Sequence, residues 1–189
     1  MVLDNNKFEK QLDIAYSILN TNDNCYINVY PRVGKTIIGF IVGSKNNKKT
    51  YIIVPNKQLQ EQMQKELNII YEYKNKAFKF NQRIEIYTKK DLMDGNILCS
   101  QGTQYDLIID EIHKYTTDDG MMSILNYMSM PHVRIIGLTG TPNEVPIVLN
   151  LKLVYKFTET NAIENNFIVP HEEYAIPLDL NPKEQHILS

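Results

Sequence analysis

The chain has 189 residues, 43% of them hydrophobic, and a formal net charge of -2 at pH 7. This length and hydrophobic content suffice to bury the core of one domain without disulfides or structural metals. The near-neutral charge excludes a broad basic surface of the histone type, so any contact with nucleic acid must be local.

The two cysteines, Cys25 and Cys99, are too far apart in the sequence for a CxxC-type site. We expect both thiols to be reduced, as is usual inside cells. The N-terminal residues lack the apolar stretch of a signal peptide, and no apolar run approaches the length of a membrane span. We therefore expect a cytoplasmic protein with no membrane partner, and a viral or phage source is compatible with the composition.

Apolar strands alternate with segments of helical periodicity, a pattern that predicts an α/β fold with a mostly parallel central sheet and helices on both faces. The predicted strands are residues 25–30, 51–54, 84–87, 107–110, 133–138 and 153–157. The clearest predicted helix is residues 58–71, whose apolar residues recur at helical spacing. A second helix is predicted at residues 118–127, and residues 45–49 are predicted to form a polar turn.

The first motif, Tyr-Pro-Arg-Val-Gly-Lys-Thr at residues 30–36, lies between a predicted strand and the helix after it. At such a junction the backbone N–H groups face a phosphate, while Lys35 would lie near the outer phosphates and Thr36 would ligate Mg²⁺. The loop residues predicted to bind a nucleotide are Arg32, Val33, Gly34, Lys35 and Thr36.

This loop departs from the full GxxxxGK[ST] pattern, because Val29 occupies the position of the first glycine. Arg32 occupies another position where glycine is common, and a non-glycine residue there should not adopt a positive φ freely. An ordinary strand-to-helix turn with a surface lysine is therefore the alternative interpretation of this motif.

Two acids, Asp110 and Glu111, come at the end of a predicted strand, at the sheet edge where open α/β folds bind ligands. Asp110 would bind Mg²⁺, directly or through water, and Glu111 would orient and deprotonate an attacking water. The alternative is that the acids only cap the next helix. That alternative does not explain His113 in the string Asp-Glu-Ile-His; the other histidines lack such a context.

With these motifs the chain resembles the first RecA-like domain of superfamily 2 helicases and translocases of the DExH type. Residues 110–113 match the DExH box, residues 34–36 match the core of the phosphate loop, and residues 138–142 are similar to the third motif with Gly140 in place of alanine. The resemblance implies a RecA-like P-loop domain that binds ATP and Mg²⁺. The catalytic residues it implies are Lys35, Asp110, Glu111 and His113.

Fainter similarities imply roles for further residues. Thr139 and Thr141 would hydrogen-bond toward the acid box and couple the nucleotide state to the strand-binding surface, with a plain strand-end turn as the alternative. Gln11 is similar to the glutamine that reads adenine, because an amide can donate and accept at once; a glutamine on an exposed helix is the alternative. The residues similar to nucleic-acid contacts are Asn56, Lys57, Thr88 and Lys89. For these, a helix N-cap at Asn56 and solvated lysines in a loop are the competing interpretations.

The resemblance also implies partners, namely nucleic acid, with DNA favoured over RNA, and a second RecA-like domain of the same polypeptide. Residues 162–170 are similar to the closing segment of this domain in restriction-enzyme motor subunits. We therefore expect an ATP-binding domain at residues 1–170 and the start of a connection at 171–189. Residues 181–184, Asn-Pro-Lys-Glu, form a good helix start close to the last residue, so we expect the natural protein to continue.

Two other functions remain as alternatives. A P-loop phosphotransferase would need a lid that carries arginines, and the three arginines of the chain do not cluster in the sequence. A non-catalytic nucleotide-binding module would be expected to lose at least one of the four residues Lys35, Thr36, Asp110 and Glu111, all of which are present.

Overall fold

The computed structural model describes residues 5–74, 84–141 and 145–167. In these residues six strands form one sheet in the order β3-β2-β4-β5-β1-β6, and every neighbouring pair is parallel. The strands are β1 (Cys25–Val29), β2 (Lys49–Val54), β3 (Ile84–Thr88), β4 (Tyr105–Ile109), β5 (Val133–Thr139) and β6 (Lys152–Phe157). The predicted boundary at residue 170 and helix start at 181–184 lie outside the described residues.

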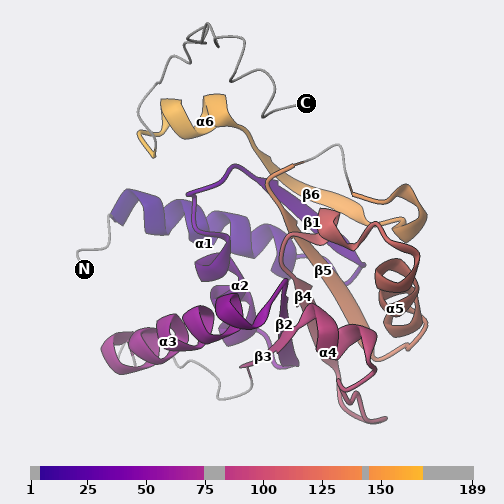
Figure 1. The fold of residues 1–189 in the computed structure, drawn as a ribbon. Helices are drawn as coiled ribbons and strands as arrows, with labels where there is room; N and C mark the ends of the chain where they lie inside the picture. Colours follow the sequence, from indigo (N-terminus) through magenta and orange to yellow (C-terminus); the bar gives the residue numbers. More distant parts are fainter. Residues whose placement is uncertain (1–4, 75–83, 142–144, 168–189) are drawn as a thin grey trace, which may run out of the picture.

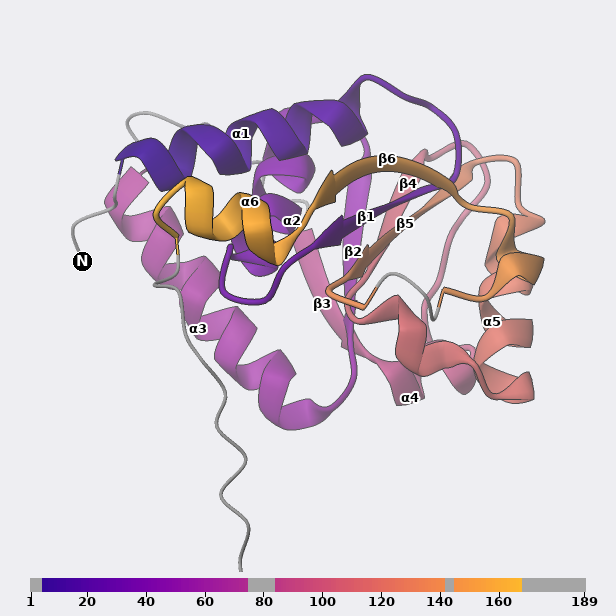
Figure 2. The same cartoon turned by 90° about the horizontal axis from the view of Figure 1, so that it is seen from above.

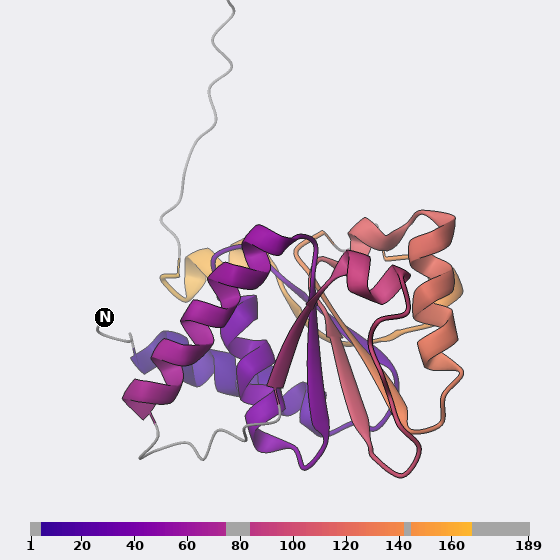
Figure 3. The same cartoon turned by 60° about the horizontal axis from the view of Figure 1, so that its bottom comes forward.

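Helices cover both faces of the sheet, as the sequence predicts (Figure 1). On one face lie α1 (Asn5–Leu19), α2 (Lys35–Lys45) and α3 (Lys57–Lys74), and on the other lie α4 (Lys89–Met93), the 3₁₀ helix η1 (Ile112–Tyr115) and α5 (Asp118–Met128). Figure 3 shows the sheet between α3 and α5. The short elements η3 (Ile147–Leu149) and α6 (Glu159–Glu164) flank β6, and α6 lies on the side of α1 (Figure 2).

Each face of the sheet has its own hydrophobic core. Every residue of β4 and of β5 is buried, which is expected for central strands of a parallel sheet covered on both faces. None of the helices in the described parts of the chain is long and apolar enough to cross a membrane.

The structure differs from the competing interpretation of Lys89 and Lys90 as solvated lysines in a loop, because these residues begin α4. Thr88 accepts a hydrogen bond from the backbone N–H of Asp91, and the Asp91 carboxylate accepts one from the backbone N–H of Thr88. This capping box gives hydrogen-bond partners to two backbone N–H groups at the start of a short helix. The loop interpretation is therefore wrong.

A buried ion pair anchors α1 to the middle of the sheet. Asp106 on β4 and Arg134 on β5 are neighbours in register, and the Arg134 Nε lies 2.9 Å from the Asp106 Oδ1. Arg134 also donates to the carbonyl oxygens of Ile18 and Thr21 at the end of α1. The pair thus fixes the position of the helix that carries Gln11.

Candidate active site

Three of the predicted motifs meet at one edge of the sheet. The strands β4, β5 and β1 are adjacent and parallel, so the segments that follow them emerge side by side. These segments are the loop after β1, the acids after β4 and residues 139–141 at the end of β5. The edge is the carboxyl edge of the sheet, where open α/β folds bind ligands.

The loop after β1 has the backbone of an anion-binding turn. Gly34 has φ 99° and ψ 55°, a left-handed conformation, directly before the first residue of α2. Arg32 also has a positive φ, 74°, although the sequence suggested that a non-glycine residue would avoid it. The Lys7 ammonium of α1 donates a hydrogen bond of 2.7 Å to the Arg32 carbonyl oxygen. The N-terminus of α2 follows the loop at the carboxyl edge, where such a terminus can bind a phosphate.

Lys35 and Glu111 form an ion pair across this edge. The Lys35 Nζ lies 2.8 Å from the Glu111 Oε1, and both side chains are largely buried. Glu111 has φ 50°, a left-handed conformation that costs free energy for a non-glycine residue. Its carbonyl oxygen accepts the backbone N–H of Lys114 at 2.8 Å, which closes the turn into η1. The chain is thus bent so that Glu111 faces the lysine of the loop.

Asp110 has the chemistry of a cation ligand. Its Oδ1 is buried and has no hydrogen-bond partner among the described residues. Burial and the neighbouring Glu111 raise the pKa of Asp110 from 3.8 to about 6, against the opposing effect of Lys35. A buried carboxylate without a partner is costly unless a cation compensates it. Mg²⁺ bound together with phosphates needs only one or two protein ligands, and Asp110 can supply one of them. Thr36, the predicted second ligand, is the second residue of α2.

His113 connects the acid box to the end of β5. Its Nδ1 lies 2.9 Å from the Thr139 Oγ1, 3.3 Å from the Thr141 Oγ1 and 3.4 Å from the Glu111 Oε2. The Thr139 hydroxyl also accepts the backbone N–H of Thr141 at 3.0 Å. The structure therefore brings both predicted coupling threonines into one network with His113 and Glu111.

Gly140 lies against the phosphate loop. A Cβ atom on Gly140 would be 3.2 Å from the Pro31 Cδ and 3.3 Å from the Lys35 Nζ. Both distances are shorter than ordinary van der Waals contact. Gly140 therefore leaves space for Lys35 at this edge.

The structure contradicts the interpretation of Gln11 as a residue on an exposed helix. Gln11 is only 3% exposed, and its Nε2 donates a hydrogen bond of 2.6 Å to the Val33 carbonyl oxygen. Lys7 is a loop contact that the sequence reasoning missed. The available signal was its spacing, since residues four apart share one face of a helix and Lys7 precedes Gln11 by one turn.

The four predicted nucleic-acid contacts lie at the carboxyl ends of β2 and β3, on the same edge of the sheet. Asn56 accepts the backbone N–H of Leu59 at 3.0 Å and so caps α3, and Lys57 is exposed. The Lys89 ammonium donates to the Lys114 carbonyl oxygen at 2.7 Å and lies 4.8 Å from the centre of the Tyr115 ring. Lys89 is therefore bound to η1, and it is not the freely solvated lysine of the alternative interpretation.

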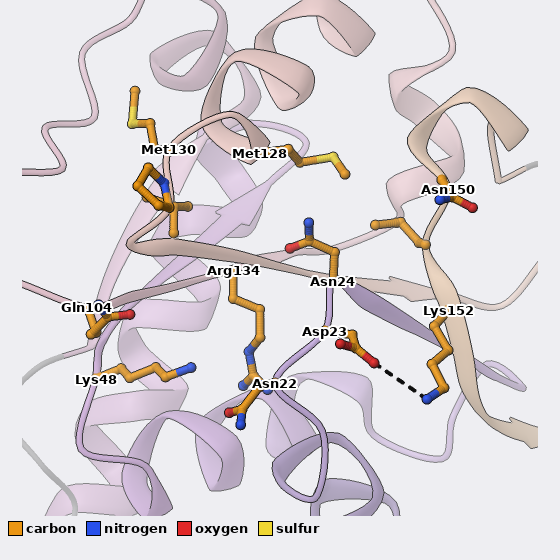
Figure 4. Close-up of a pocket in the computed structure, with 13 residues that line it drawn as sticks. Asn22, Asp23, Asn24, Lys48, Gln104, Met128, Met130, Arg134, Asn150 and Lys152 are labelled. Atoms are coloured by element: carbon orange, nitrogen blue, oxygen red, sulfur yellow. Dashed lines mark hydrogen bonds and ion pairs between the residues drawn. The ribbon is translucent and has the colours of Figure 1, made fainter.

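A cavity of about 940 Å³ lies at the opposite, amino-terminal edge of the sheet (Figure 4). None of the predicted site residues lines it. Its cations already have acidic partners, since Lys48 lies 3.4 Å from Asp106 and Lys152 lies 3.5 Å from Asp23. We assign no ligand to this cavity.

Comparison with solved structures identifies the class of the fold. The chain is similar to the UvsW helicase from bacteriophage T4, with a TM-score of 0.57, 18% identity and coverage of 78% of this chain and 58% of that one. It is similar to the Pyrococcus furiosus Hef helicase domain, with a TM-score of 0.58, 19% identity and coverage of 79% and 37%. It is also similar to the Sulfolobus solfataricus SWI2/SNF2 ATPase core in complex with dsDNA, with a TM-score of 0.50, 18% identity and coverage of 75% and 32%.

The fold is that of a RecA-like ATP-binding domain of superfamily 2 helicases, as the motifs predict. Residues 5–144 match the family described as Type III restriction enzyme, res subunit, and the chain belongs to that family. No curated protein matches the sequence. The chain spans from about a third to somewhat more than half of the length of the three solved structures.

Proposed function

We propose that this domain binds and hydrolyses ATP with Mg²⁺, as the ATP-binding half of a nucleic-acid helicase or translocase. The observation that carries the proposal is the contact between Lys35 and Glu111, which are 76 residues apart in sequence. A lysine at a helix N-terminus and a carboxylate beside it are the groups that a γ-phosphate and its attacking water require.

The roles of the residues follow from their positions. The N-terminus of α2 and Lys35 would bind the phosphates, and Asp110 with Thr36 would hold Mg²⁺, which would supply positive charge beside the transferred phosphoryl group. Glu111 accepts a proton from the attacking water once the nucleotide has drawn Lys35 away from it. Thr139 and Thr141 contact His113, and through it they couple to the nucleotide state of this site.

Nucleic acid is the proposed substrate, with DNA favoured over RNA. The exposed Lys57 and the start of α3 lie at the same edge as the nucleotide site, where they can contact phosphates. The Sulfolobus relative was solved in complex with dsDNA. A second RecA-like domain would complete the site and supply the other half of the nucleic-acid track.

Phosphate release from ATP tests the proposal. The 189-residue chain should release inorganic phosphate slowly and without stimulation by duplex DNA, and Lys35→Ala should abolish the release while Lys65→Ala, on the exposed side of α3, leaves it unchanged. Rapid DNA-stimulated turnover by this chain alone would contradict the need for a second domain. Transfer of the phosphoryl group to a small acceptor would favour a phosphotransferase, and a chain that neither binds nor hydrolyses ATP would favour a non-catalytic module.

A further inference from the structure

The strand β5 has a glycine at the place where the acid box, residues 110–113, folds over it. Gly137 lies opposite Ile109, the last residue of β4, in the register of the two strands. The chain leaves β4 and returns against β5 with Ile112, the first residue of η1. A glycine inside a strand often marks a point where another segment approaches closely. Gly137 marks such a point for η1.

Ile112 packs directly on Gly137. A Cβ atom on Gly137 would lie 2.8 Å from the Ile112 Cδ1, 3.0 Å from the Ile112 Cγ2 and 3.1 Å from the Tyr26 Cβ on β1. All three distances are shorter than ordinary van der Waals contact. Ile112 is fully buried, and a closely packed core offers it no free space into which it could turn away. A side chain at residue 137 would therefore press on Ile112 and displace η1.

His113 makes a second contact between η1 and the same face of β5. Residues two apart in a strand point to the same face, so Gly137 and Thr139 are neighbours there. The His113 Nδ1 lies 2.9 Å from the Thr139 Oγ1. The strand thus holds η1 at two successive residues, because Ile112 rests on the backbone of Gly137 and His113 is hydrogen-bonded to Thr139.

The position of η1 also determines where the Glu111 carboxylate lies. Glu111 directly precedes η1, and the backbone N–H of Lys114 donates a hydrogen bond of 2.8 Å to its carbonyl oxygen. Its carboxylate in turn lies 2.8 Å from the Lys35 Nζ. A displacement of η1 would therefore move the Glu111 carboxylate relative to Lys35.

From these contacts we infer that Gly137 is a positioning residue, whose missing side chain lets η1 lie on β5 and so places Glu111 and His113 for hydrolysis. The effect acts through the acid box, so it concerns the rate of hydrolysis and does not strengthen the binding of ATP. The inference rests on the proposed function, since Glu111 and His113 belong to the same nucleotide site.

Phosphate release and ATP titration, both with Mg²⁺, test the inference on three variants and the wild-type chain. Gly137→Ala should lower the rate at saturating ATP by about tenfold without weakening ATP binding, because small displacements of reacting groups have large effects on rate. The exchange variant Gly137→Ala/Ile112→Val adds one methyl group and removes the Cδ1 that it would meet. It should recover the wild-type rate to within about twofold, since volume-conserving changes are tolerated best.

Gly43→Ala in α2 is the matched control. Its Cβ atom would lie 2.9 Å from the Ile84 Cδ1, which is as tight a contact as the one at Gly137. It lies on the other face of the sheet from η1 (Figure 1), so it should keep the wild-type rate. A wild-type rate in Gly137→Ala, an equal loss of rate in Gly43→Ala, or an exchange variant as slow as Gly137→Ala would overturn the inference.

The ring nitrogens of His113 give a second measurement that does not depend on turnover. Their chemical shifts in NMR spectra report the hydrogen bond to Thr139, so Gly137→Ala should change them while Gly43→Ala and the exchange variant should not. If the wild-type chain releases no phosphate, the proposed function fails, and unchanged His113 shifts in Gly137→Ala would then separately overturn the positioning of the acid box. If Gly137→Ala does not fold, the exchange variant decides, because only the wild-type rate and shifts there would support the inference.

Discussion

The Lys35 ammonium lies 2.8 Å from the Glu111 carboxylate, so the loop lysine and the acid box are bound to each other before any phosphate arrives. Under the proposed function, a γ-phosphate would have to displace Glu111 from Lys35. The pair would then oppose nucleotide binding while it keeps both side chains in place.

The substitution Glu111→Gln should raise the affinity for ATP by about threefold, because it removes the competing charge of a partly buried pair, and it should abolish phosphate release. Calorimetry and a phosphate-release assay on the same preparation measure the two effects. If Glu111→Gln hydrolyses ATP at the wild-type rate, Glu111 is not the base.

Asp110 should make the chain less stable as the pH rises. Its pKa in the folded chain, about 6, is above its ordinary value of 3.8, so the folded state binds the extra proton between these values. The stability that this proton gives is present below pH 4 and is lost as the pH rises through 6, with a contribution of about 3 kcal/mol. Denaturant unfolding of Asp110→Asn at pH 8 should show a gain of that order, whereas the control Asp119→Asn, at an exposed position of α5, should show none. An Asp110→Asn variant no more stable than wild type at pH 8 would refute this account.

Gly140→Ala should weaken ATP binding through Lys35. The added methyl group would lie 3.3 Å from the Lys35 Nζ and 3.2 Å from the Pro31 Cδ, so one of the two must move. We expect a loss of about fivefold in affinity with little change in the thermal midpoint. Gly39→Ala in α2 is the matched control, because a Cβ atom there meets its neighbours at 3.8 to 3.9 Å. Equal affinities for the two variants would show that Gly140 leaves Lys35 unconstrained.

Arg134→Met should destabilise the fold, because it leaves the fully buried Asp106 without its main partner. The expected loss is about 3 kcal/mol in the free energy of unfolding. Lys152→Met removes a pair whose two side chains are 64% and 66% exposed, and it should have no measurable effect. Denaturant titration of both variants gives the comparison, and a similar result for the two would mean that the buried pair does not anchor α1.

Much of the fold could be predicted from the sequence, because the buried parallel strands are short apolar runs that end at turn residues. The carboxyl-edge position of Asp110 followed from the same pattern. The short helix α4 was missed because five residues give no helical period, although its capping pair, Thr88 and Asp91, is visible in the sequence.

What could not be predicted depends on contacts between distant segments. The contact of Lys7 with the Arg32 carbonyl oxygen and the burial of Gln11 both require α1 to pack on α2 and the sheet. The pairing of Asp106 with Arg134 requires β4 and β5 to be neighbours in register, which strand patterns alone do not determine.

Titration of ATP with Mg²⁺ into the wild-type chain and into Lys35→Ala, with Lys65→Ala as the control, tests the nucleotide site most directly. We expect measurable binding by the wild type and by Lys65→Ala, and a loss of at least about tenfold in Lys35→Ala, since a charge-assisted contact to phosphate is worth roughly 1.5 to 3 kcal/mol. Equal affinity in Lys35→Ala and the wild type, or no binding by the wild type, would contradict the assignment of the loop after β1 as the phosphate site.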